Sequence, residues 1–139
     1  FAGSGAIGIE ALSRGAACCV FVESSPKGAG CIRDNLRFTH LDGQARVMTE
    51  DVLTAIRQLD GEKPFDCIFM DPPYRKGLEL AALEALKDTT LVDENTLLVA
   101  EASLDTDWEA VEKLGYRVKK IKKYKTNQHI FLKTEKGYV

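Results

Sequence analysis

The feature that most constrains the fold is an apolar run that ends in a double proline. Residues 65–70 read as a buried strand of a parallel sheet, and the tetrad Asp71, Pro72, Pro73 and Tyr74 follows directly. Neither proline can donate a backbone hydrogen bond, so the strand must end there and the turn is stiff. In an open α/β sheet, ligands bind just beyond the carboxyl ends of the strands. The tetrad is therefore predicted to lie at a binding edge of such a sheet.

The groups of the tetrad suit a planar ring that carries an exocyclic amine. Asp71 and the unpaired backbone carbonyls can accept hydrogen bonds from the amine, while Tyr74 offers an aromatic face on which the ring can stack. A simpler interpretation is a proline-rich turn in which Asp71 caps the next helix. The tetrad by itself leaves both interpretations open.

Strand patterns and helix patterns alternate along the chain. This alternation predicts an α/β fold with a three-layer, doubly wound, mostly parallel sheet. Residues 116–124 and 129–132 can pair across a turn, which predicts a C-terminal antiparallel hairpin. A strand must feed the glycine loop at residues 3–8, and none fits ahead of Phe1, so we expect the N-terminal strand to be missing from this sequence. The expected strands before the hairpin are residues 18–22, 45–49, 65–70 and 96–100.

Composition narrows the class of protein. The chain has 139 residues, 45% hydrophobic and 29% charged, and we expect one domain over residues 1–139. No apolar run approaches the ~20 residues of a membrane span, so we expect no membrane contact. Only two histidines are present and neither is near a cysteine, so we expect no bound metal. No C-x-x-C spacing occurs, so the cysteines read as small core residues of a reduced, cytoplasmic protein: Cys18, Cys19, Cys31 and Cys67.

The glycine loop and two acidic residues predict a nucleotide cofactor. Residues 3–8 match G-x-G-x-x-G, which presents backbone N–H groups at a helix N-terminus, although a packing turn can match by chance. Glu23 ends the next strand 20 positions after Gly3, the spacing at which a carboxylate can accept both ribose hydroxyls. Asp51, after the following strand, could accept from an adenine amine while the Val52 backbone contacts the ring. Asp51 could equally be an ordinary helix cap.

The first 16 residues and the tetrad together resemble the S-adenosylmethionine-dependent N-methyltransferases. The closest resemblance is to the RsmD-type enzymes, which methylate the N2 amine of a guanine in 16S ribosomal RNA. This resemblance implies a Rossmann-like class I methyltransferase fold and S-adenosylmethionine as cofactor. The glycine loop would wrap its methionine end, Glu23 would bind the ribose, and Asp51 and Val52 would lie at the adenine. The implied cofactor-binding residues are Phe1, Ala2, Gly3, Ser4, Gly5, Glu23, Ser24, Asp51 and Val52.

The resemblance assigns catalysis to Asp71, Pro72, Pro73 and Tyr74. An exocyclic amine on a purine is a poor nucleophile because its lone pair is delocalised into the ring. Asp71 and the Pro72 carbonyl can accept its two N–H bonds, and Tyr74 can stack on the base, so that the lone pair faces the methyl donor. A base in folded RNA must be splayed or flipped to reach such a pocket. The implied partner is ribosomal RNA or the small ribosomal subunit, and we expect a monomer.

Basic residues gather in two segments of a chain whose net charge is only −2. Arg75 and Lys76 follow the tetrad directly, and Lys123 and Lys125 belong to a lysine-rich segment near the C-terminus. We predict that these four residues bind RNA phosphates, although a lysine-rich edge strand can also serve to prevent aggregation. The two histidines, His40 and His129, read as structural or surface residues, and Trp108 as a core residue.

Several other functions use some of the same residues. The main alternative is an adenine-N6 methyltransferase on DNA or RNA, because the same tetrad suits both amines. Methylation of a protein glutamine fits less well, since the related enzymes resemble Asn-Pro-Pro-Tyr. A nicotinamide-dependent oxidoreductase would use the glycine loop and Glu23, but it leaves the tetrad unexplained. A non-catalytic RNA-binding module would need neither the loop nor the tetrad.

Overall fold

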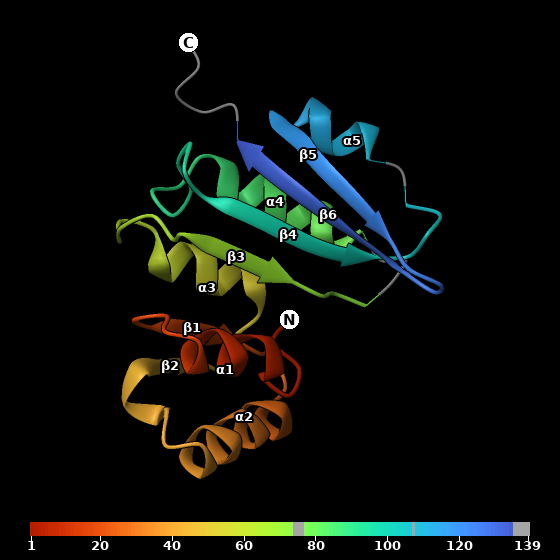
Figure 1. Ribbon diagram of the computed structural model, residues 1–139. Coiled ribbons are helices and arrows are strands. Elements are labelled where there is room, and N and C mark those ends of the chain that lie inside the picture. The colour runs from red at the N-terminus through yellow and green to blue at the C-terminus, as the bar shows by residue number, and fades with distance from the viewer. Residues whose placement is uncertain (74–76, 107, 135–139) are drawn as a thin grey trace. The chain divides into compact units, whose positions relative to one another are not determined.

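The computed structural model describes residues 1–73, 77–106 and 108–134 (Figure 1). The chain divides into two compact units, Phe1–Ala55 and a second unit that begins at Ile56. Both units combine helices with β-strands, as the alternating pattern predicts. None of the helices in the described part of the chain is long and apolar enough to cross a membrane.

The first unit is built around a two-stranded parallel sheet. Strands β1 (Cys19–Val22) and β2 (Ala45–Met48) pair along their full lengths, with helix α2 (Pro26–Phe38) connecting them. Helix α2 starts at a capped residue: the Ser25 hydroxyl accepts a hydrogen bond from the Gly28 N–H at 3.2 Å, and Pro26 follows the cap. The remaining elements are α1 (Ala6–Ser13), the 3-10 turn η1 (Asp42–Gln44) and the start of α3 (Val52–Leu59).

Close packing between α1 and β1 fixes the glycine loop in place. Phe21 of β1 is buried in a core cluster with Leu12 of α1 and with Ile32 and Leu36 of α2. A Cβ at Gly8 would lie 2.3 Å from Cε1 of the Phe21 ring, so this position cannot hold a side chain without moving the core. The third glycine of the motif therefore lets the helix approach the strand.

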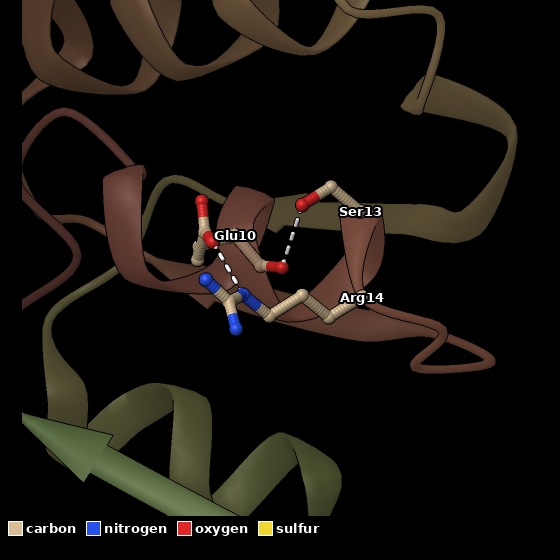
Figure 2. Close-up of polar contacts among 3 residues, drawn as sticks. All are labelled: Glu10, Ser13 and Arg14. Atoms are coloured by element: carbon tan, nitrogen blue, oxygen red, sulfur yellow. Dashed lines mark hydrogen bonds and ion pairs between the residues drawn. The ribbon is translucent and has the colours of Figure 1, made fainter.

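The outer face of α1 contributes little to stability. Arg14 Nε lies 2.5 Å from Glu10 Oε1, and the Ser13 hydroxyl donates to the Glu10 carbonyl at 2.8 Å (Figure 2). The two charged side chains are 79% and 60% exposed, and ion pairs of this i,i+4 type contribute about 0.3–0.5 kcal/mol. Gly15, at φ 109°, follows the end of the helix.

The second unit contains a four-stranded mixed sheet in the order β3-β4-β6-β5 (Figure 1). Strands β3 (Cys67–Met70) and β4 (Leu97–Ala102) are parallel, while β6 (Gln128–Thr134) runs antiparallel to β4 and to β5 (Tyr116–Lys123). The predicted C-terminal hairpin is therefore confirmed. Helices α4 (Leu78–Lys87) and α5 (Glu109–Lys113) complete the described elements of this unit.

The two faces of this sheet differ in burial. Along β6, burial alternates. Gln128, Ile130 and Leu132 are buried, whereas His129 and Phe131 are only partly buried. The buried face packs against α4, because the Tyr116 hydroxyl of β5 donates to the Leu83 carbonyl at 2.5 Å. The opposite, partly buried face carries His129.

The prediction that the cysteines are core residues is wrong. Cys18, Cys31 and Cys67 are exposed, Cys19 is only partly buried, and all four are free thiols. Cys31 precedes the fully buried Ile32 on α2, and adjacent helical residues point in different directions. Cys18 directly precedes β1, and Cys67 is the first residue of β3.

Candidate active site

The glycine loop is attached to the carboxyl end of β1. The Ala2 N–H donates to the Val22 carbonyl at 3.0 Å, and the Asn35 side-chain amide of α2 donates to the Ser4 carbonyl at 3.0 Å. Gly3 and Gly5 have φ values of 59° and 81°, which favour glycine because a side chain would be strained there. Gly3 and Ser4 are exposed, so the backbone of the loop is accessible to a ligand.

The carboxylate of Glu23 lies against this loop, as its spacing from Gly3 predicts. Its Oε1 accepts from the Gly3 N–H and its Oε2 from the Ser25 N–H, both at 3.1 Å. A carboxylate has about four acceptor positions, so about two remain after these bonds. Glu23 is therefore oriented by the backbone and still has one acceptor position on each oxygen, which fits the vicinal hydroxyls of a ribose.

Gly28 provides the space that Glu23 occupies. A Cβ at Gly28 would lie 3.0 Å from Glu23 Cγ and 3.2 Å from its Cδ. No sequence motif marks this glycine, because the contact depends on how the start of α2 meets the end of β1.

Asp51 caps α3. Its Oδ1 accepts from the Thr54 N–H at 3.0 Å, and its Oδ2 accepts from the Thr54 hydroxyl at 2.6 Å. The cap is thus observed, and the adenine contact of Asp51 and Val52 stays a prediction. Both residues follow β2, and the Glu23 N–H donates to the Met48 carbonyl at 3.1 Å, so Glu23 and Asp51 belong to the same edge of the β1-β2 sheet.

The tetrad begins directly after β3 in the second unit. Pairing of β3 with β4 runs to Met70 opposite Ala100 and stops at Asp71, directly before the two prolines, as predicted. Pro72 is buried, whereas Asp71 and Pro73 are exposed. The predicted base-stacking residue and phosphate-binding residues that follow, Tyr74, Arg75 and Lys76, lie outside the described residues.

Two side chains that no motif predicted lie beside Asp71. Glu101 of β4 is the residue next to Asp71 across the β3-β4 pair, and its carboxyl acts on that of Asp71. The Glu101 Oε1 also lies 3.8 Å from Nε2 of His129, the residue directly opposite it on β6. The pKa of Asp71 is raised to about 6, mainly by partial desolvation and to a smaller extent by hydrogen bonding with Glu101 and by its negative charge. A positive charge on His129 acts in the opposite direction and lowers this pKa.

Aromatic rings surround His129 on the partly buried face. Its ring meets Phe69 edge-on with centroids 6.2 Å apart, and Tyr124 with centroids 5.0 Å apart. The Lys122 ammonium lies 5.5 Å from the centroid of the Tyr124 ring. His129 is therefore in contact with Phe69, Tyr124 and Glu101. The expectation of a structural or surface residue captured its position but missed these neighbours.

A signal in the sequence could have identified Glu101. It is an acidic residue near the end of an apolar strand, as Glu23 and Asp71 are. His129 carries no such signal, because its place beside Glu101 depends on the antiparallel register of β4 and β6.

The lysines predicted to bind RNA lie on the exposed hairpin. Lys123 ends β5 opposite Gln128, Lys125 lies in the turn that follows, and both are exposed. Within residues 1–73, 77–106 and 108–134, no group of three or more His, Cys, Asp or Glu side chains is arranged to hold a metal ion.

Comparison with known proteins gives consistent results. A family model described as "Conserved hypothetical protein 95" matches residues 1–133. A Bacillus subtilis protein named "Putative rRNA methyltransferase YlbH" is 36% identical over 116 residues, which are 83% of this chain and 62% of that protein. "Ribosomal RNA small subunit methyltransferase D" of Haemophilus influenzae is 33% identical over 106 residues, which are 76% of this chain and 55% of that protein. The chain thus spans less than two thirds of the length of these curated relatives.

The fold also matches a solved structure. A crystal structure described as a putative methylase from Haemophilus influenzae is 27% identical and has a TM-score of 0.84, covering 96% of this chain and 83% of that one. This match confirms the predicted α/β fold, a Rossmann-like class I methyltransferase fold with a C-terminal antiparallel hairpin.

Proposed function

Because this chain belongs to the RsmD-type family, whose model is described as conserved hypothetical protein 95, we propose that it is an S-adenosylmethionine-dependent ribosomal RNA methyltransferase. We further propose that the acceptor is the N2 amine of a guanine in 16S ribosomal RNA. The observation that carries the proposal is the carboxylate of Glu23, held on the glycine loop with acceptor positions left for a ribose. We also propose that the protein acts in the cytoplasm, where ribosomal RNA is found, and that it is a monomer.

The residues of the first unit fit the cofactor. The exposed loop at Gly3 and Ser4 would bind the methionine end, Glu23 the ribose hydroxyls, and Asp51 with Val52 the adenine. Phe1, Ala2, Gly5 and Ser24 complete this set. When bound, S-adenosylmethionine supplies a methyl group that its sulfonium already activates.

The residues after β3 would orient the acceptor. Asp71 and the Pro72 carbonyl would accept the two N–H bonds of the amine, which directs the nitrogen lone pair away from them. The nitrogen has one proton too many after it gains the methyl group, and the Asp71 carboxylate is suited to receive that proton. Tyr74 would stack on the base, and Arg75, Lys76, Lys123 and Lys125 would bind phosphates of the RNA.

Two substitutions should separate cofactor binding from transfer. We expect Glu23→Gln to weaken binding of S-adenosylhomocysteine about tenfold or more, because hydrogen bonds to a charged group contribute about 1.5–3 kcal/mol. Asp71→Ala should bind S-adenosylhomocysteine normally and lose nearly all methyl transfer. Calorimetry measures the binding, and transfer is measured with small ribosomal subunits from a strain that lacks the enzyme.

The products and ligands decide between the candidate functions. Mass spectrometry of the digested RNA should find N2-methylguanosine, whereas N6-methyladenosine would establish the main alternative. Binding of NAD without any binding of S-adenosylhomocysteine would overturn the methyltransferase class. Full transfer by the Asp71→Ala variant would remove the role given to the tetrad.

A further inference from the structure

Three titratable side chains from three neighbouring strand positions meet at one end of the second sheet. Asp71 follows β3, Glu101 lies on β4 and His129 lies on β6. We propose that Glu101 and His129 are positioning residues that set the protonation of Asp71, with Glu101 sharing its proton and His129 offsetting the negative charge of the pair. This inference rests on the proposed function of Asp71 as the acceptor of the substrate amine.

The sheet register brings the three residues together. β3 and β4 are paired in parallel up to Met70 and Ala100, so Asp71 and Glu101 are the next residues along the two strands. Glu101 is in turn directly opposite His129 in the antiparallel pair of β4 and β6. The backbone pairing therefore places the three residues at neighbouring strand positions.

Asp71 and Glu101 can share a hydrogen bond only when one of the two carboxyls is protonated, because two ionised carboxylates can only accept. When both are ionised, the site carries two negative charges side by side, which a positive charge on the His129 imidazole, 3.8 Å from Glu101, would partly balance.

Two of the three side chains are partly shielded from solvent, whereas Asp71 is exposed. The side chains of Glu101 and His129 are only 18% and 26% exposed, so water and salt screen their charges less than on an open surface. Phe69 and Tyr124 contact the imidazole ring and fix its orientation. Lys122, opposite His129 on β5, also carries a charge near His129, and its ammonium lies over the Tyr124 ring.

The arrangement has a consequence for the reaction. Asp71 accepts a hydrogen bond from the amine before transfer and the proton of the amine after transfer. The second step requires that Asp71 is ionised. Glu101 opposes this ionisation and gives the received proton a second carboxylate to share. His129 favours ionisation, so the balance of the two neighbours sets the pH above which Asp71 works.

The first test follows Asp71 itself and needs neither RNA nor cofactor. The side-chain carboxyl carbon of Asp71 is titrated by NMR in the unaltered protein and in Glu101→Gln and His129→Gln, with Asp71→Asn used to assign the signal. We expect the midpoint of Asp71 to fall by about one pH unit in Glu101→Gln and to rise by about half a unit in His129→Gln. The exposed Glu94→Gln is the matched control and should leave the midpoint in place.

The second test compares pH profiles of methyl transfer. The acidic limb of kcat/KM should move to lower pH in Glu101→Gln and to higher pH in His129→Gln, whereas a purely structural role would not produce opposite shifts. Opposite NMR shifts without any transfer to RNA would support the inference and count against the proposed function. Unmoved midpoints, or midpoints that move in the same direction in both variants, would overturn the inference even if transfer is observed.

Discussion

The position of Glu23 depends on a neighbouring residue that has no side chain. Gly28 faces the Cγ and Cδ atoms of Glu23 at distances that leave no room for a methyl group without a shift. Because Glu23 is a flexible side chain, it would give way by a few tenths of an ångström before the helix moved. This shift would weaken its hydrogen bonds from the Gly3 and Ser25 N–H groups, and with them the orientation proposed for ribose binding.

We therefore predict that Gly28→Ala weakens binding of S-adenosylhomocysteine about tenfold, which corresponds to the loss of about one hydrogen bond to a charged group. The fold should persist, because alanine favours the helix. Gly30→Ala is the matched control on the same helix, since a Cβ there meets nothing within 4 Å. It should stabilise the protein by about 0.5–1 kcal/mol and leave binding unchanged. Calorimetry and urea unfolding measure the two effects, and equal affinities in both variants would contradict the role of Gly28.

At the scale of elements, the hairpin of β5 and β6 has two interpretations. β5 is at the edge of the sheet order β3-β4-β6-β5, and its lysines are exposed, as expected both for phosphate binding and for protection of an open edge. Lys123 and Lys125 lie at the turn end of the hairpin, as does Tyr124, which contacts His129. Their nearness to the Asp71 cluster favours the RNA interpretation.

The salt dependence of RNA binding separates these interpretations. Replacing Lys123 and Lys125 with alanine should lower affinity for ribosomal RNA and reduce the slope of log K against log salt by about 1.5, because each phosphate contact contributes about 0.7–0.9. The double variant Lys27→Ala/Lys63→Ala removes two exposed lysines from other segments and should leave the slope unchanged. An unchanged slope in the hairpin variant, together with increased aggregation, would establish edge protection instead.

Elements defined by local sequence were predictable, and contacts between distant strands were not. Ser25 and Pro26 mark the start of α2 within a few residues of chain, and the double proline marks the end of β3. Glu23 was predictable because its spacing from the loop is set by one helix and one strand. His129 was not, because its partner Glu101 is selected by the register of two strands far apart in sequence. The exposure of Cys31 likewise depends on which face of α2 packs inward.

At the scale of the whole molecule, the cluster around Asp71 links stability to pH. The pKa of Asp71 is raised from 3.8 to about 6 in the folded protein, so the folded state holds this proton more tightly than the unfolded chain. The resulting contribution to stability is complete below about pH 4 and is lost as pH rises through about 6. This sign is opposite to that of a carboxylate stabilised by an ion pair, whose contribution is lost as pH falls.

The free energy of unfolding should show this sign directly. We predict that the difference in unfolding free energy between the unaltered protein and Asp71→Asn falls between pH 4.5 and pH 7.5, because asparagine does not titrate and the other carboxyls are common to both proteins. The change should not exceed about 1 kcal/mol, since Asp71 is exposed and solvent screens its interactions. Urea unfolding at several pH values measures it. A difference that grows with pH would mean that Asp71 is stabilised as a carboxylate, and that the proton shared with Glu101 does not exist in the folded protein.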